Sequence, residues 1–452
     1  MSAPIDKDAA RRLRHAYLTE TPVPVLIRNL SIPTIISMLI SGLYNMADTF
    51  FVGRISTEAT AAVGVVFSLM AVIQALGFFC GHGSGNYLSR KLGEGQIKEA
   101  SEMAATGFAL AFLLGIAVLA VGQLFLEPLS FLLGATPAIL KDTQHYMRII
   151  LLGAPCMTSQ LVMNNQLRFQ GSAVYAMAGL VSGAVLNIAL DPLFIFVLGM
   201  GVSGAALATV LSQFTGFCVL FAGTRRGANL RIHLRHVRFT SRYLLQIVNG
   251  GTPSLFRQGL ASVSTIVLNT TAGSLGGEAA IAGMSIVTRV MMLANSALIG
   301  FGQGFQPVCS FNYGARLFAR VREGFFFCVK FGTAFLVCMA SLCFVFAPQI
   351  ISFFRHDPAV VAVGTAALRY QAAVFPLAAY IIMSNMFLQS IGKGVKASLM
   401  AASRNGLFFI PFILLLAPLL GLRGVEMTQM CADVCSFLVA VPLSRSELKK
   451  LN

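Results

Sequence analysis

Two aspartates lie within stretches of sequence that are otherwise apolar. Asp48 is near one end of SIPTIISMLISGLYNMADTFFVG at 31–53, and Asp191 lies in LNIALDPLFIF at 186–196. A carboxylate is expensive to place in a lipid bilayer, so an aspartate inside a membrane segment is by default a hypothesis for a functional site. We therefore expect Asp48 and Asp191 to form one ion-exchange site.

Both acids have oxygen-bearing neighbours at helical spacing. Tyr44 precedes Asp48 by four residues and Asn187 precedes Asp191 by four, so each pair would share one face of a helix. Thr209, in the next apolar stretch, is predicted to lie at a matching depth. Carboxylate, amide and hydroxyl oxygens suit a proton or a small hard cation.

The coupling ion predicted from this set is H⁺ or Na⁺, with Asp48, Asp191, Asn187 and Thr209 as the possible Na⁺ ligands. No firm metal site and no cofactor are expected. A structural role is the alternative, because an intramembrane aspartate can cap a broken helix, and Pro192 follows Asp191 directly.

Other residues interrupt the apolar stretches. Pro33 removes a backbone hydrogen bond, and it could act as a hinge or be a static proline in a first helical turn. Arg257 and Gln258 lie in mid-segment and are expected to line a cavity or to bond across a helical bundle. Glu426 and Asp433 could form a second cation site, although packing or cavity lining is the favoured interpretation.

The composition is that of a polytopic membrane protein. Of the 452 residues, 56% are hydrophobic and 11% are charged, and the mean hydropathy is +0.77. A run of about 20 apolar residues can span a bilayer. Twelve such runs predict an all-α fold of twelve transmembrane helices, at 30–52, 59–80, 102–123, 146–166, 174–198, 202–222, 244–270, 280–302, 324–347, 363–388, 396–418 and 424–442.

The formal net charge of +16 is explained by membrane orientation rather than by nucleic-acid binding. Most Lys and Arg residues fall in alternate loops, which predicts that both termini are cytoplasmic and that basic faces contact anionic membrane lipids. The polar start of the chain does not resemble a secretory signal, so we expect the first span to remain as an anchor in the plasma membrane. The nine cysteines show no disulfide or metal spacing and are expected to be free thiols.

The chain repeats itself after about 220 residues. SIPTIISMLISG at 31–42 aligns with GTPSLFRQGLAS at 251–262, and GHGSGNYLSRKLGEG at 81–95 aligns with GQGFQPVCSFNYGAR at 302–316. The repeat predicts two pseudo-symmetric six-helix lobes with substrate near their interface. The expected divisions are a cytoplasmic segment at 1–29, an N-lobe at 30–223, a cytoplasmic linker at 224–243, a C-lobe at 244–444 and a cytoplasmic tail at 445–452.

The two acids have no acidic counterpart in the second copy of the repeat. Asp48 aligns with Leu268 and Asp191 aligns near Ile410, so the carboxylate chemistry is expected in the first lobe alone. The glycine-rich segment at 81–96 lacks the GK[ST] ending of a phosphate loop. Close packing and a tight turn are expected there instead.

The combination of motifs resembles the multidrug and toxic compound extrusion transporters, in particular their DinF-like branch. The resemblance covers nearly the whole chain and rests on IPTIISMLISGLYNMADTFFVG, GHGSGNYLSRKLGEGQ, NIALDPLFIF, GVSGAALATVLSQ, GTPSLFRQ and IGFGQGFQPVCSFNYGA. It implies a V-shaped antiporter, expected to be a monomer, that exports amphipathic or cationic organic compounds against an inward flow of H⁺ or Na⁺.

The resemblance also implies roles for individual residues. In this branch, the functional acids match Asp48 and Asp191, and the residues that support them match Tyr44, Asn187 and Thr209. A proline at a proposed bend matches Pro33. Another branch has its acids on helices 7 and 8, where this chain has Arg257 and Gln258 and no acid, so that site is not carried over.

One alternative function is a flippase of lipid-linked saccharides, which distant relatives of similar topology carry out. Such a flippase requires a cationic cavity, of which Arg257 and Arg289 are the only signs in the sequence. An enzyme or a receptor is not expected, because the sequence shows no nucleophile motif, metal-ligand cluster or soluble catalytic domain.

Overall fold

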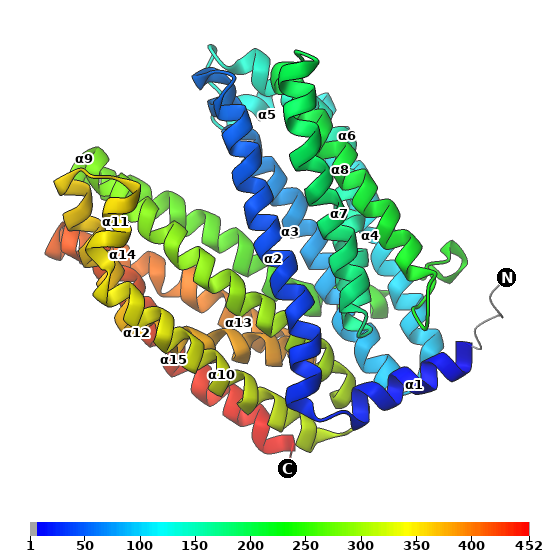
Figure 1. Ribbon diagram of the computed structural model, residues 1–452. Coiled ribbons are helices and arrows are strands. Elements are labelled where there is room, and N and C mark those ends of the chain that lie inside the picture. The colour runs from blue at the N-terminus through cyan, green and yellow to red at the C-terminus, as the bar shows by residue number, and fades with distance from the viewer. Residues whose placement is uncertain (1–6, 452) are drawn as a thin grey trace.

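The computed structural model describes residues 7–451, and within this range the chain is helical with no β-strand. Figure 1 shows two groups of helices that diverge from a shared end in the shape of a V. The first described helix, at Lys7–Glu20, and the last described turn, at Lys449–Leu451, lie near the shared end (Figure 1). Positions 1–6 of the predicted N-terminal segment and position 452 of the predicted tail lie outside the described residues.

The first group follows a polar helix, α1 (Lys7–Glu20), and contains six spanning helices. A short helix, α5 (Leu126–Leu132), precedes the fourth of them. The six are α2 (Val23–Gly53), α3 (Thr57–Gly93), α4 (Ile97–Leu124), α6 (Leu140–Phe169), α7 (Ala173–Pro192) with its π-helical continuation η1 (Leu193–Val197), and α8 (Gly201–Thr224).

The second group has the same plan, including a short helix, α11 (Ala347–Phe354), at the position equivalent to α5. One span is interrupted, with α13 (Gly394–Ala402) joined through π-helical η3 (Ser403–Leu407) to α14 (Phe409–Leu420). The other elements are α9 (Ser241–Gly314), α10 (Phe318–Val345), α12 (Pro358–Ser390) and α15 (Leu422–Leu448).

The predicted fold of twelve spans is confirmed. In residues 7–451, eleven helical segments are long and apolar enough to cross a membrane. One of them, α9, has 74 residues and is broken at Gly277, where φ is 61° and ψ is −155°. That backbone conformation is essentially limited to glycine. Since each side of the break is long enough to span, α9 contributes two spans and the total is twelve.

Several helices extend past the predicted apolar runs. The first span begins at Val23 rather than at 30, and α6 continues to Phe169 rather than ending at 166. Arg168, which lies between the predicted spans at 146–166 and 174–198, is consequently helical and only 2% exposed. Hydropathy marks the part of a helix that lipid can surround, and the predicted runs stop where polar residues interrupt them, at Arg28 and Asn29 in α2 and at Arg168 in α6.

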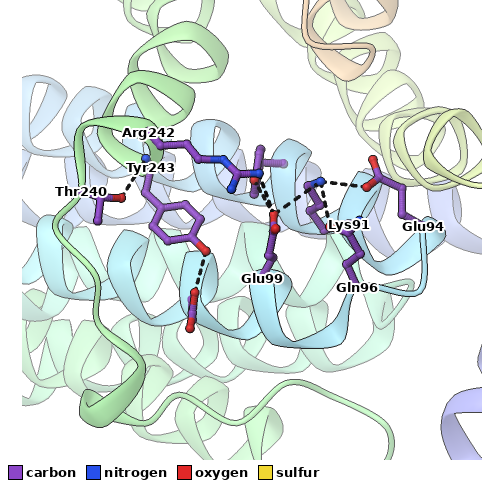
Figure 2. Close-up of polar contacts among 9 residues, drawn as sticks. Lys91, Glu94, Gln96, Glu99, Thr240, Arg242 and Tyr243 are labelled. Carbon is purple, nitrogen blue, oxygen red and sulfur yellow. Dashed lines mark hydrogen bonds and ion pairs between the residues drawn. The ribbon is translucent and has the colours of Figure 1, made fainter.

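The basic linker packs against the first group of helices rather than being free in solvent. Its backbone donates from Leu230 to Gln170 Oε1 at 2.7 Å and from Arg238 to Thr106 Oγ1 at 2.9 Å. Figure 2 shows the start of α9, where Arg242 reaches Glu99 of α4 at 3.1 Å and Tyr243 donates to Glu102 at 2.6 Å. The linker therefore fixes where the second group of helices begins.

Glycines allow the two groups to meet at the shared end. A Cβ atom on Gly93 of α3 would lie 2.1 Å from the Phe311 carbonyl oxygen of α9, and one on Gly314 would lie 2.0 Å from the Arg90 carbonyl oxygen. These residues belong to the two repeated glycine-rich segments, so each half contributes one copy to a single interface. The close packing predicted for the first copy is found there.

We expect Gly93→Ala to destabilise the shared end by about 1–3 kcal/mol, the usual cost of overpacking a tight contact. The added methyl group has no room beside a backbone carbonyl, so α3 and α9 must move apart. Thermal unfolding in detergent should show a lower Tm. Maleimide labelling of Cys309, which is buried in α9, should rise by mass spectrometry.

Gly64→Ala is the matched control, because it lies in the same helix and its added Cβ would meet nothing within 4 Å. Alanine is a better helix former than glycine by about 1 kcal/mol, so this variant should be at least as stable as the parent. Equal Tm changes in the two variants would show that the α3–α9 contact is not tight.

Candidate functional site

A cavity of about 730 Å³ lies between the two groups of helices. Residues of α2, α3, α6, α7 and α8 form one wall, and residues of α9 and α12–α15 form the other. The lining is rich in methionines and side-chain amides, and among the described residues its charged side chains are those of Arg257 and Arg404. This size and mixture suit a small organic ligand, with flexible methionines adapting to its shape.

The two predicted acids come together beside this cavity. Asp48 of α2 is 4% exposed and Asp191 of α7 is fully buried, and the two helices pack against each other. The carboxylates are close enough to interact electrostatically. Asp48 Oδ1 and Asp191 Oδ2 have no hydrogen-bond partner among the described residues. A buried acceptor without a partner is unusual and calls for a proton or an ion.

The supporting residues lie between the acids and the cavity. Asn187 Nδ2 donates to Asp191 Oδ1 at 3.3 Å and to Thr209 Oγ1 at 3.5 Å. Tyr44, Asn187 and Thr209 line the cavity, whereas Asp48 and Asp191 lie behind its wall. The carboxylates are therefore shielded from the cavity by one layer of polar side chains.

The oxygen atoms present fit a proton or Na⁺. Besides the two free carboxylate oxygens, Asn187 Oδ1 is buried and without a hydrogen-bond partner in the described part of the chain. Three such oxygens and the Thr209 hydroxyl are hard ligands of the type that Na⁺ prefers. Within residues 7–451 no cluster of His, Cys, Asp and Glu is suited to a transition metal.

Two further residues join this group and were missed from the sequence. Tyr146 of α6 is fully buried, interacts electrostatically with both acids, and has a hydroxyl without a partner among residues 7–451. Gln213 of α8 lies near Tyr44. Gln213 follows Thr209 by one helical turn, a spacing that could have identified it. Tyr146 fell at the edge of its predicted span, where depth could not be judged.

Pro33 is in the interior of α2, ten residues after the helix begins at Val23. The interpretation as a proline in the first helical turn is therefore wrong. Nearby hydroxyls bond within the helix, since Thr34 donates to the Leu30 carbonyl at 2.9 Å and Ser37 donates to the Pro33 carbonyl at 2.8 Å. The backbone around Pro33 is helical in this structure.

The polar residues predicted in the second half divide into two groups. Arg257 and Gln258 line the cavity, as expected. Glu426 and Asp433 are buried and are not among the lining residues, so of the two expected roles, packing or cavity lining, their position agrees with packing. Asp433 accepts from Arg404 at 2.8 and 3.2 Å and from Gln429 at 2.8 Å, so it is the internal counterion of Arg404.

A buried polar cluster closes the cavity at the shared end. Arg168 of α6 donates to Gln303 of α9 and, at 2.5 Å, to Asn165, and it lies 3.4 Å from His82 Nε2. The bond to Gln303 joins the two halves. Arg289, by contrast, is exposed and does not line the cavity, so it adds nothing to the cationic cavity that a saccharide flippase requires.

We expect Asp433→Ala to lower the free energy of unfolding by about 3 kcal/mol, because it leaves the largely buried Arg404 guanidinium without its counterion. The Tm measured in detergent should fall. In the double variant Arg404→Met with Asp433→Leu, the unpaired charge is gone and most of the loss should be recovered. If Asp433→Ala keeps the parental Tm, the ion pair has no structural role.

Comparison with known proteins places the chain among transporters. The MatE family model matches twice, at residues 33–193 and 253–415, with the same separation of about 220 residues as the internal repeat. The multidrug export protein MepA of Staphylococcus haemolyticus is 26% identical over 426 residues, which is 93% of each chain. MepA of Staphylococcus aureus strain NCTC 8325 is 26% identical over 430 residues, 94% of each chain.

Solved structures share the whole fold. A MOP superfamily transporter from Pyrococcus furiosus, described as having a binding pocket of reverse polarity, has a TM-score of 0.90 at 27% identity and covers 97% of this chain and 98% of its own. A MATE transporter solved in a bent conformation has a TM-score of 0.90 at 27% identity, with 98% of each chain covered. Since the two family-model matches together cover well over half of the sequence, this multi-pass membrane protein belongs to the MatE family.

Proposed function

We propose that this protein is a multidrug efflux antiporter of the plasma membrane. It exports amphipathic or cationic organic compounds in exchange for protons or sodium ions. Support comes from the cavity of about 730 Å³ between the halves and from relatives of nearly equal length that are multidrug export proteins. The exposed apolar side chains around the helices are in keeping with a monomer surrounded by lipid.

The observation that carries this proposal is the buried pair Asp48 and Asp191 behind the cavity wall. When the pair releases its ion, negative charge appears in a poorly solvated place, and Tyr44, Asn187 and Thr209 transmit that change to the cavity. A cationic substrate is favoured by the ion-free state, and a returning H⁺ or Na⁺ displaces it. Competition for one set of carboxylates is sufficient for exchange.

Alternating access requires that the shared end opens while the diverging end closes. In this structure the halves meet at the end where α1 lies and α15 ends (Figure 1). With both termini cytoplasmic, the cavity belongs to an outward-facing state, from which substrate leaves and the ion enters. Rupture of the Arg168–Gln303 bond and of the glycine contacts is the barrier to the inward-facing state.

Neutralising either acid should abolish coupling. In vesicles loaded with a fluorescent organic cation, we expect Asp48→Asn and Asp191→Asn each to reduce gradient-driven efflux by more than about tenfold, since a lost interaction of 1.4 kcal/mol already has that effect. Separate proton and sodium gradients applied to the parent protein identify the ion. Glu58→Gln, which removes an exposed carboxylate, is the control and should transport normally. Undiminished efflux by both aspartate variants would refute the proposal.

Pro33 is proposed as the point at which α2 bends during transport. Its ring cannot donate a backbone hydrogen bond, so the helix is weaker at this turn than elsewhere. Pro33→Ala should restore that bond, favour the straight helix and slow efflux several-fold, while the affinity for substrate in detergent changes by less than about twofold. An equal loss of binding and efflux would instead assign Pro33 to the structure of the site.

A further inference from the structure

The two walls of the cavity carry opposite charge. The buried acids belong to α2 and α7 of the first half, and they reach the cavity only through neighbouring polar groups. The charged side chains that line the cavity directly, Arg257 and Arg404, belong to the second half. Among the described residues, no Asp or Glu lines the cavity. A ligand therefore contacts positive charge directly on the wall of the second half, while on the other wall negative charge lies one layer of polar side chains behind the surface.

The two arginines are not equivalent. Arg404 is neutralised by Asp433, which binds two of its nitrogens at 2.8 and 3.2 Å. Arg257 has no carboxylate partner among residues 7–451. Its side chain donates one long hydrogen bond, of 3.4 Å, to the neutral amide oxygen of Asn385. Arg257 is thus the cation of the cavity whose charge is not compensated.

The residues around Arg257 favour the binding of an anionic group beside it. It is close enough to Arg168 and His82 at the shared end to interact electrostatically with both. Arg168 is also without a carboxylate, because its partners are Gln303, Asn165 and His82. A buried guanidinium group, that of Arg168, close to the half-buried one of Arg257, with only neutral partners for both, is costly. An anionic group from the ligand would lower that cost.

The chemistry of the guanidinium selects the kind of anion. Its planar donors match a carboxylate in two parallel hydrogen bonds, which are stronger and more directional than bonds to an amide oxygen. The amides of Gln258 and Asn385 lie beside Arg257 on the same wall and could complete the set of donors. Methionines such as Met284 and Met291 form the apolar surface between the two charged regions.

We propose that the preferred substrates are zwitterionic amphiphiles whose carboxylate binds Arg257 while their cationic group lies toward Asp48 and Asp191. This inference deepens the proposed export function and rests on it. It assigns Arg257 as a specificity-determining residue rather than as a member of the ion-coupling site. A purely cationic compound of the same shape binds more weakly, because it offers no anionic group and leaves Arg257 unpaired.

Two rhodamines test this assignment because they differ in one group. Rhodamine 110 has a free carboxylate and is a zwitterion, and rhodamine 123 is its cationic methyl ester. Binding to the purified full-length protein is followed by fluorescence polarisation in a neutral detergent, which excludes anionic lipid as a competitor. We expect the parent protein to bind the zwitterion at least about tenfold more tightly, and Arg257→Gln to remove this preference.

The controls separate specificity from folding. Arg257→Gln should bind the ester within about twofold of the parent, which also reports that the variant is folded. Arg257→Lys should keep part of the preference, because it keeps the charge but not the planar donors. Arg289→Gln removes an exposed arginine from the other span of α9 and should change neither affinity. A parental preference for the ester, or an equal loss for both dyes in Arg257→Gln, would overturn the proposal.

Transport measurements distinguish a failure of this inference from a failure of the proposed function. If neither ion gradient drives efflux of either dye but the Arg257-dependent preference in binding is present, the antiport function fails and the carboxylate site stands. If efflux of the ester is gradient-driven and depends on Asp48, but Arg257→Gln leaves the preference between the dyes unchanged, the function stands and the carboxylate site is refuted.

Discussion

The close approach of α3 and α9 at the shared end is the constraint on which the rest of the structure depends. Backbone lies against backbone there, since a Cβ atom at Gly93 or Gly314 would overlap a carbonyl oxygen of the other helix. Only at this separation can polar side chains bond across the halves, as Ser310 does to Asn86 at 3.0 Å. The same packing of the two halves brings Gln303 of α9 within reach of Arg168 at the closed end of the cavity.

Charges buried near the cavity are left with incomplete sets of partners. The Asp48 and Asp191 oxygens and the Arg257 guanidinium all lack an opposite charge within the described chain, whereas Asp433 and Arg404 satisfy each other. In a medium of low dielectric constant, an unsatisfied charge responds strongly to any ion or ligand that arrives. The paired residues contribute stability, and the unpaired ones are available for binding.

Much of the fold could be predicted because a bilayer imposes few alternatives. Apolar runs must be helices, and the repeat with a period of about 220 residues requires two similar halves. The residues at which the helices begin and end could be predicted less well. The first span is longer than its predicted run because α2 continues to Val23 past Arg28 and Asn29, which interrupt the apolar pattern. The break at Gly277 falls between the two predicted runs at 244–270 and 280–302. Short helices such as α5 have no periodic signal of their own.

The candidate site, like the fold, could be predicted only in part from the sequence. The sequence by itself determined that Asp48 and Asp191 would be buried acids and that Asn187 would share a face with one of them, because helical spacing and the cost of charge in lipid are local properties. Only the tertiary structure decided that the acids lie behind the wall, that Tyr146 joins them, that Asp433 is bound by Arg404, and that Arg257 is left unpaired in the cavity. Those outcomes depend on which side chains distant helices bring within hydrogen-bond reach, and no local pattern records the packing of one helix against another.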